Sequence, residues 1–283
     1  MDHKLNHILL KGWIDMFAER MKTPAIPERV FALCKEIKNN GIAEKELKEK
    51  LEPRFLGGTT AYFGDVRTAA QQLGLINIKE GIISLAVDEN NIDNISNMRK
   101  YCIRRLDSLK NGLFYNVTRE YMAMNEGVLK YDSVSDMSEL FEKLTNMKIN
   151  VDDMRAWRFW ATFLGYGYMQ EMQNPSRSKN CMILLPNMYI NLKEIFEICN
   201  FEQNKEYAVS EIMNSIRPYC EITLKDIDNE KKFNLAFSNG LRMLHDTGKI
   251  SLKHKLDGGE MWFLYPLELH EIKSTITHIT IRG

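Results

Sequence analysis

Basic side chains concentrate near the C-terminal end of this 283-residue sequence. Between positions 231 and 255 there are six lysines and arginines, but only one acidic residue, Asp246. The basic residues are Lys231, Lys232, Arg242, Lys249, Lys253 and Lys255, to which Asn234 and His254 add further hydrogen-bonding groups. Side chains of these types bind the phosphate oxygens of nucleic acid. We therefore predict that this set contacts DNA, with a solvated polar face and a lysine-protected strand edge as the alternative.

A second candidate set lies closer to the N-terminus. It comprises Thr60, Arg67, Gln71 and Lys79. Arginine and glutamine can read base edges, whereas the nearby Asp65 and Glu80 would repel phosphate. Residues 27–87 carry nine basic and eight acidic side chains, so this region has almost no net charge. Base contact and docking of a protein partner are both open here.

A third basic set occupies the middle of the sequence. It comprises Arg155, Arg158, Arg177 and Lys179. An aromatic run accompanies it, from Trp157 to Tyr168. Aromatic rings can stack on nucleic-acid bases, but rings at helical spacing more often pack inside a protein. We expect this run to form core.

Residues that could carry catalysis or hold a metal are sparse. His3 and His7 are four residues apart on an expected helix, a spacing compatible with a metal, but no third ligand accompanies them. Asp257, Glu271 and Lys273 have the residue types of a metal-dependent nuclease, although Asp257 belongs to an expected turn. The five cysteines show no ligand spacing. We expect a protein that is not an enzyme and needs no cofactor.

Hydrophobic periodicity indicates the elements that position the basic set at residues 231–255. Apolar residues recur every third or fourth position over residues 233–244, which predicts a helix that ends at Gly248. Residues 249–255 and 261–265 read as two strands joined by a turn. This order forms the second half of a winged helix, whose third helix enters the major groove. Helices over residues 190–199 and 208–216, the latter ended by Pro218, would complete the module, and residues 270–282 could add a strand.

The N-terminal third shows the same order of elements. The pattern predicts helices over residues 28–39, 43–51 and 59–73, followed by strands over 75–78 and 82–87. A further amphipathic helix is expected over residues 5–21. Three helices and a two-stranded wing make a complete winged helix, so the second candidate set would lie on its third helix and wing.

The middle of the sequence repeats the order less completely. A helix is expected over residues 153–164, followed by Gly165 and by strands over 166–172 and 181–185. We predict a mainly α protein with small β-hairpin wings, built from tandem winged-helix modules. The expected divisions are an N-terminal helix over 1–24, a winged helix over 25–90, a helical middle region with a candidate second winged helix over 91–187, and a third winged helix with a C-terminal strand over 188–283.

The overall charge excludes a global attraction to nucleic acid. Lysine and arginine balance aspartate and glutamate at 38 each, so any attraction must be local. No stretch approaches the roughly 20 apolar residues of a membrane span, and residues 5–17 lack the apolar segment of a secretory leader. We expect a cytoplasmic protein without membrane contact.

Two short strings carry a resemblance to a known family. They are Ala161-Thr-Phe-Leu-Gly-Tyr-Gly-Tyr and Ile183-Leu-Leu-Pro-Asn. The arrangement of the chain resembles the DpdG-like accessory proteins of bacterial defence and DNA-modification operons. That resemblance implies an ATPase or nuclease partner and a role in antiviral defence. The sequence thus predicts a non-enzymatic protein that binds double-stranded DNA within a larger complex; a protein-docking adaptor and a transcription regulator are the alternatives.

Overall fold

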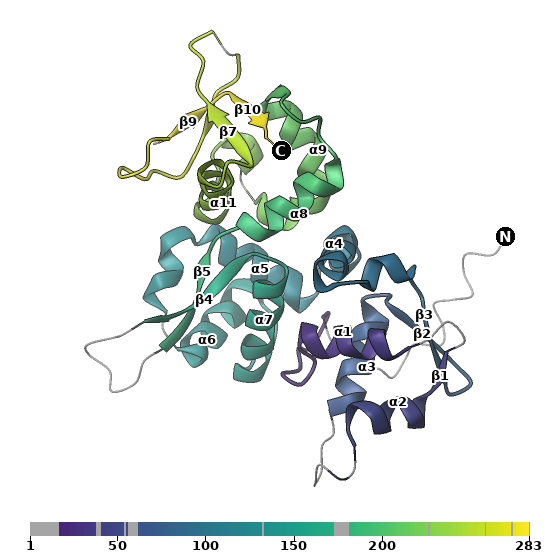
Figure 1. Ribbon diagram of the computed structural model, residues 1–283. Coiled ribbons are helices and arrows are strands. Elements are labelled where there is room, and N and C mark those ends of the chain that lie inside the picture. The colour runs from purple at the N-terminus through teal and green to yellow at the C-terminus, as the bar shows by residue number, and fades with distance from the viewer. Residues whose placement is uncertain are drawn as a thin grey trace, which may run out of the picture.

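The computed structural model shows a mainly α protein with small antiparallel sheets (Figure 1). It describes residues 17–37, 41–53, 55, 62–131, 133–172, 181–225, 227–257, 259–272 and 274–282. The helices and sheets form an N-terminal, a middle and a C-terminal unit. In the view of Figure 1 the C-terminal unit lies above the middle unit, and the N-terminal unit lies to the right of the middle unit.

The N-terminal unit has the predicted helices and hairpin, and one additional strand. Its elements are α1 (Pro27–Glu36), β1 (Ile42–Ala43), α2 (Glu44–Leu51), α3 (Tyr62–Gln72), β2 (Ile76–Lys79) and β3 (Ile82–Leu85). The strands form an antiparallel sheet in the order β1-β3-β2, with Ile83 opposite both Ile42 and Ile78. Gly74 ends α3 in the left-handed conformation (φ +67°), which a residue with a side chain adopts only under strain. The expected helix start at residues 59–61 lies outside the described residues.

A connecting region leads to the middle unit. It consists of η2 (Glu89–Ile92), α4 (Ile95–Arg105) and η3 (Leu106–Leu109). The middle unit follows with α5 (Leu113–Ala123), η4 (Asn125–Lys130), α6 (Val134–Thr145), α7 (Val151–Phe163), β4 (Gly167–Met172) and β5 (Cys181–Pro186). The two strands pair along their whole length, from Gly167 opposite Pro186 to Met172 opposite Cys181.

The aromatic run of the middle unit divides between core and surface. Trp157 and Trp160 are buried, and their indole nitrogens donate to Thr118 Oγ1 at 2.9 Å and to the Ala25 carbonyl at 2.8 Å. The expectation of core is therefore confirmed for these two rings. Phe159 and Tyr168 are instead exposed, because they lie on the other face of α7 and on the outer face of the hairpin.

The described residues of the C-terminal unit form four α-helices, one of them a single turn, and two small sheets. Its elements are α8 (Tyr189–Cys199), β6 (Glu206–Ala208), α9 (Val209–Cys220), η5 (Glu221–Thr223), α10 (Ile227–Glu230), α11 (Leu235–Asp246), β7 (Ile250–Lys253), β8 (Trp262–Phe263), β9 (Thr275–Ile276) and β10 (His278–Ile281). One sheet has the order β6-β10-β7, and β8 pairs with β9 in the other. Helix α9 continues through Pro218 to Cys220, four residues beyond its predicted end.

The predicted hairpin between residues 249–255 and 261–265 is wrong. Strand β7 pairs with the C-terminal strand β10, with Ile250 opposite Ile281, which confirms the added strand. The 261–265 segment does not pair with β7, because it packs against Phe233 instead. The Trp262 ring stacks on Phe233 with centroids 5.2 Å apart, and the Phe233 amide donates to the Phe263 carbonyl at 2.7 Å.

The segment before α1 belongs with the middle unit. The backbone amides of Leu113 and Phe114 donate to the carbonyls of Ala18 and Phe17, at 2.8 and 3.1 Å. The Met21 amide donates to Asp153 Oδ1 at 2.8 Å, and Arg20 forms an ion pair with the same carboxylate. Residues 17–21 are therefore not helical, contrary to prediction, because their backbone bonds go to α5 and α7; residues 1–16 lie outside the described residues.

Helix α11 closes the junction between the middle and C-terminal units. It packs against α8 and also contacts β5 and η4. The Met188 amide donates to the Ala236 carbonyl at 2.9 Å, and the Leu235 amide donates to Asn125 Oδ1 at 2.7 Å. In the part of the chain that the structure describes, no helix combines the length and the apolar character needed to cross a bilayer.

Candidate functional site

The side chain of Arg242, which was predicted to be open to DNA, is instead buried. It is 2% exposed, and its guanidinium donates to the carbonyls of Ile272 at 3.0 Å and Tyr265 at 2.9 Å. Burial lowers the pKa of this guanidinium from its ordinary value. Arg242 therefore holds the 265–272 segment against α11.

Asn234, also predicted to contact DNA, is buried and caps a helix. Its side-chain oxygen accepts from the Phe237 amide at 2.9 Å and caps the start of α11, while its amide nitrogen donates to the Thr223 carbonyl at 2.9 Å. The helix that it begins packs closely on α8. A methyl group added at Gly240 would lie 2.8 Å from the Met188 carbonyl carbon, which shows how closely α11 and α8 approach.

Four of the predicted lysines are paired with carboxylates. Lys253 and Lys255 both bind Glu206, the first at 2.7 Å, and these bonds lower the pKa of Glu206 to about 2. Lys231 pairs with Glu260, and Lys232 pairs with Glu230 at 2.8 Å. Lys253 lies on β7 rather than at a hairpin tip. Lys249 and His254 are exposed, and the charge that would attract phosphate is partly offset by the three carboxylates that pair with the other lysines.

The second candidate set is dispersed in the N-terminal unit. Thr60 lies outside the described residues. Arg67 is mostly buried and forms an ion pair with Glu44, so its charge is offset. Gln71 is partly exposed on α3, and Lys79 is exposed at the end of β2. None of the three described side chains lines either of the two hollows described below.

Two arginines of the third set do converge with residues distant in the sequence. A cleft of about 530 Å³ lies between the start of α1, the start of α3 and the outer face of α7. Its lining residues are Thr23, Pro24, Ile26, Arg29, Tyr62, Asp152, Arg155, Arg158 and Phe159. Three arginines face one aspartate, so we call this hollow the arginine cleft. Arg177 and Lys179 lie outside the described residues.

The three arginines are held differently. Arg29 donates to the Pro24 carbonyl at 3.0 Å, and its guanidinium lies 4.7 Å from the centre of the Tyr62 ring. Arg155 pairs with Asp152 at 2.9 Å but keeps 54% of its side chain exposed. Arg158 donates to the Met182 carbonyl at 2.7 Å. Each guanidinium has five donors, so these contacts leave donors for a ligand.

Arg158 shows that the cleft concentrates positive charge. Its Nε atom is buried and has no hydrogen-bond partner among the described residues. Burial, and then repulsion by the nearby Arg155 charge, lowers the pKa of Arg158. An anion bound between the two side chains would relieve that repulsion.

Two exposed aromatic rings flank these arginines. Tyr62 at the start of α3 is 42% exposed, and Phe159 on α7 is 48% exposed. Cations beside open rings match the two parts of a nucleotide, because arginine binds phosphate and a ring can stack on a base. No sequence pattern links Arg29 to Arg155; the only signal was that Arg155 and Phe159 lie one helical turn apart.

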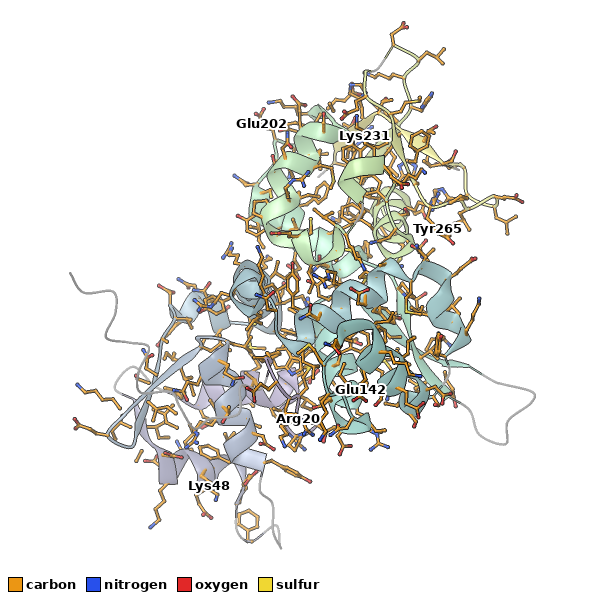
Figure 2. The ribbon with its side chains drawn as sticks, turned by 180° about the vertical axis from the view of Figure 1, so that it is seen from behind. Arg20, Lys48, Glu142, Glu202, Lys231 and Tyr265 are labelled. Carbon is orange, nitrogen blue, oxygen red and sulfur yellow. The ribbon has the colours of Figure 1, made fainter. Side chains whose placement is uncertain are left out.

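The arginine cleft is far from the basic set predicted at residues 231–255. Figure 2 places Arg20, which pairs with Asp153 at the start of α7, at the junction of the N-terminal and middle units. Lys231 lies in the C-terminal unit at the opposite end of the molecule. The two regions therefore cannot form one continuous positive face.

The residues that could carry catalysis or hold a metal can be placed only in part. Within them, no three or more histidine, cysteine, aspartate or glutamate side chains are grouped closely enough to hold a metal. Glu271 of the suggested nuclease triad binds His245 Nε2 at 2.7 Å, while His3, His7 and Lys273 lie outside the described residues. Burial raises the pKa of both Cys34 and Cys102 to about 12, so neither thiol supplies a thiolate at neutral pH.

Comparison with known proteins adds no relative to this picture. No protein-family model matches the sequence, and no curated protein matches it either.

Proposed function

We propose that this protein binds DNA through the arginine cleft and is built from three winged-helix units. The order helix, strand, helix, helix and hairpin supports a winged helix in the N-terminal unit, and the C-terminal unit has the same order of α8, β6, α9 and α11 with a strand pair, β7 and β10, in place of the hairpin. The sheet order of both units also supports winged helices, because the last strand lies between the other two. The middle unit supports it less fully, since no strand precedes its second helix among the described residues.

The convergence of three arginines on the outer face of α7 carries this proposal. Helix α7 is the third helix of the middle unit, and α3 is the third helix of the N-terminal unit. In winged helices that position commonly faces the major groove. Arg155 and Arg158 on α7 and Tyr62 on α3 line the same cleft, so one DNA backbone could contact both units.

Binding should depend on salt in proportion to the phosphates neutralised. Three arginine–phosphate contacts give a slope of roughly −2.7 in log K against log salt for duplex DNA. Between about 50 and 200 mM salt, affinity should then fall roughly 40-fold. Because the formal net charge of the chain is zero, this dependence would report the local cleft rather than a global field.

The test is a salt titration of a fluorescently labelled duplex by anisotropy. We expect an Arg155→Ala/Arg158→Ala variant to lose most of the slope and to show only a roughly 3- to 4-fold change over the same salt range. A matched Lys253→Ala/Lys255→Ala variant also removes two cations, but it removes a pair already held by Glu206. We expect that control to keep the wild-type slope.

Two outcomes would overturn the proposal. The first is an absence of binding at low salt, which would favour the protein-docking alternative. The second is an unchanged slope in the α7 variant together with a loss in the lysine control, which would return DNA contact to the C-terminal unit. The ATPase or nuclease partner and the role in defence stay predictions, to be tested by co-purification from the source cell.

A further inference from the structure

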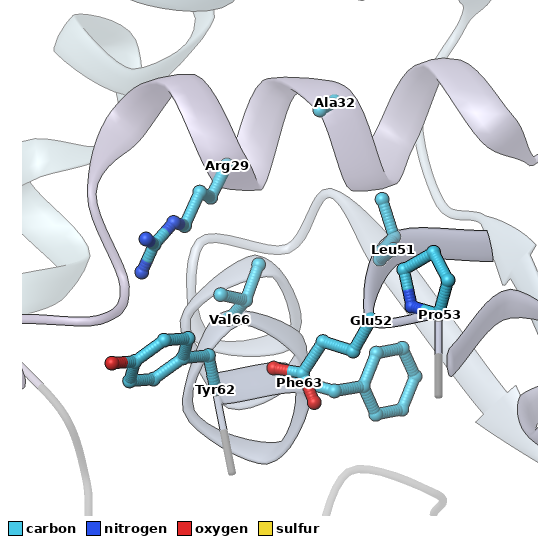
Figure 3. A pocket seen from close by; sticks show the side chains of 8 residues that line it. All are labelled: Arg29, Ala32, Leu51, Glu52, Pro53, Tyr62, Phe63 and Val66. Atoms are coloured by element: carbon cyan, nitrogen blue, oxygen red, sulfur yellow. The ribbon is translucent and has the colours of Figure 1, made fainter. Parts of the chain in front are cut away.

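A second hollow adjoins the arginine cleft and differs from it in chemistry. It has a volume of about 340 Å³ and lies between α1, the end of α2 and the start of α3. Its lining residues are Arg29, Ala32, Leu51, Glu52, Pro53, Tyr62, Phe63 and Val66 (Figure 3). Arg29 and Tyr62 line both hollows, so a ligand passing these two side chains would contact both.

Glu52 is the unusual member of this mostly apolar lining. Both of its carboxylate oxygens are buried, and neither has a hydrogen-bond partner among the described residues. Figure 3 shows the carboxylate between the side chains of Tyr62 and Phe63. Burying acceptors without donors is unfavourable. A carboxylate without a donor among the described residues therefore lines a hollow with aromatic and aliphatic walls.

The missing partner can be defined by its chemistry. It should be flat and largely apolar, to lie against Tyr62 and Phe63, and it should present two adjacent N–H donors to one carboxylate. The Watson–Crick edge of guanine has this pair, whereas adenine and cytosine each offer a single amino group and thymine a single ring N–H. Unpaired bases are commonly read by hydrogen bonds to this edge and by stacking.

We propose that this hollow binds one unpaired guanine base of a DNA strand whose phosphate lies in the arginine cleft. This inference rests on the proposed function and adds a base preference to it. Its volume is near the lower end of the roughly 300–1,000 Å³ of small-ligand sites. Arg29 would stand between the base and the phosphate, at the boundary that the two hollows share.

The experiment compares four labelled oligothymidylates that differ only in one central base. We expect wild-type protein to bind the guanine oligonucleotide about 10-fold more tightly than the other three, as for a bidentate base contact. Glu52→Gln should abolish this preference, because the glutamine amide offers only one acceptor oxygen. The matched variant Glu28→Gln makes the same charge change on the exposed side of α1 and should keep the preference.

A second variant tests the hollow without altering Glu52. Ala32→Phe places a large side chain in the hollow from an exposed position on α1, so it should preserve the fold, as checked by thermal unfolding, while removing the guanine preference. Equal salt-dependent binding of all four oligonucleotides by wild type would overturn the guanine site but keep DNA binding. Preference retained in both Glu52→Gln and Ala32→Phe would also overturn it. Failure of every oligonucleotide to bind, while the labelled duplex still binds, would overturn the guanine site alone. Failure of both the oligonucleotides and the duplex would refute the proposed function itself.

Discussion

Helices α7 and α11 occupy the same position in their units but have opposite surroundings. Each is the last helix of its unit and is followed by a strand. The outer face of α7 presents Arg155 and Phe159 to a cleft. The corresponding side of α11 packs against α8 and contacts β5 and η4, and even Arg242 is buried there. The position of a helix in a repeated unit therefore does not determine its accessibility; the neighbouring unit does.

The largest expected difference between α11 and α7 is in the loss of stability when an arginine is replaced. Arg242→Met removes the donors to the Ile272 and Tyr265 carbonyls and should lower the free energy of unfolding by about 3 kcal/mol. Arg155→Ala on α7 should change it by less than about 0.5 kcal/mol, because that side chain is largely exposed. Urea unfolding of both variants measures the difference. Equal losses would mean that α11 is less enclosed than its contacts indicate.

Glycines in α11 and α3, the last helices of their units, offer a matched test of packing. Gly240→Ala on α11 places a methyl group against the α8 backbone and should destabilise the protein by about 2 kcal/mol. Gly64→Ala on α3 meets no atom within 4 Å and should stabilise it by about 0.5 kcal/mol, since alanine favours helix. Thermal unfolding would show shifts of opposite sign. A stabilising effect at Gly240 would contradict the close approach of α11 and α8.

Exposed apolar side chains on α7 and on α11 should contribute differently to DNA binding. Phe159→Ala on α7 should weaken binding of single-stranded DNA about 10-fold, because a stacking ring is lost. Met243 on α11 is similarly open, at 37% exposure against 48% for Phe159, yet Met243→Ala should leave the affinity unchanged. Anisotropy with a labelled oligothymidylate measures both. Similar losses in the two variants would mean that neither helix is preferred.

The smallest expected effect is on the pH dependence of stability, through the ion pairs of Glu206 with Lys253 and Lys255. The Glu206 pKa falls from 4.5 to about 2 in the folded protein. A depressed carboxyl pKa stabilises the fold above the unfolded value and loses that contribution as pH falls from about 4.5 toward 2. Glu206→Gln should therefore make the melting temperature depend less on pH in this range than it does in wild type. Glu202→Gln, which removes the carboxylate paired with Lys205, is the control and should keep the wild-type slope.

Local patterns were sufficient to predict most helices and their ends. Apolar spacing placed α1, α2, α7, α8 and α11 within a few residues, because each helix must bury one face. The strand partner of β7 could not be read in this way. Segments 261–265 and 278–281 both contain apolar residues in a pattern that suits a strand beside β7. Which of them pairs with β7 depends on a tertiary contact, the stacking of Trp262 on Phe233.

The candidate site was harder to predict than the fold. Charge counts favoured residues 231–255, but counting along the chain cannot show that Glu206, 47 residues from Lys253, pairs with two of the lysines. A usable signal was present in α11 itself, where Ser238 and Gly240 are small and Arg242 is the only lysine or arginine. Such a composition is typical of a helix packed on several sides. The proximity of Arg29 to Arg155 is purely tertiary.

The path of residues 17–26 has a consequence for how the chain acquires its fold during synthesis. Asp153, which binds Met21, follows it by 132 residues, and Trp160 follows Ala25 by 135. The ribosome must therefore release more than half of the chain before this early segment finds its place. Contacts of such long range slow folding and leave apolar residues exposed meanwhile. Phe17 and Met21, both buried in the finished protein, are among the side chains that a nascent-chain chaperone would encounter first.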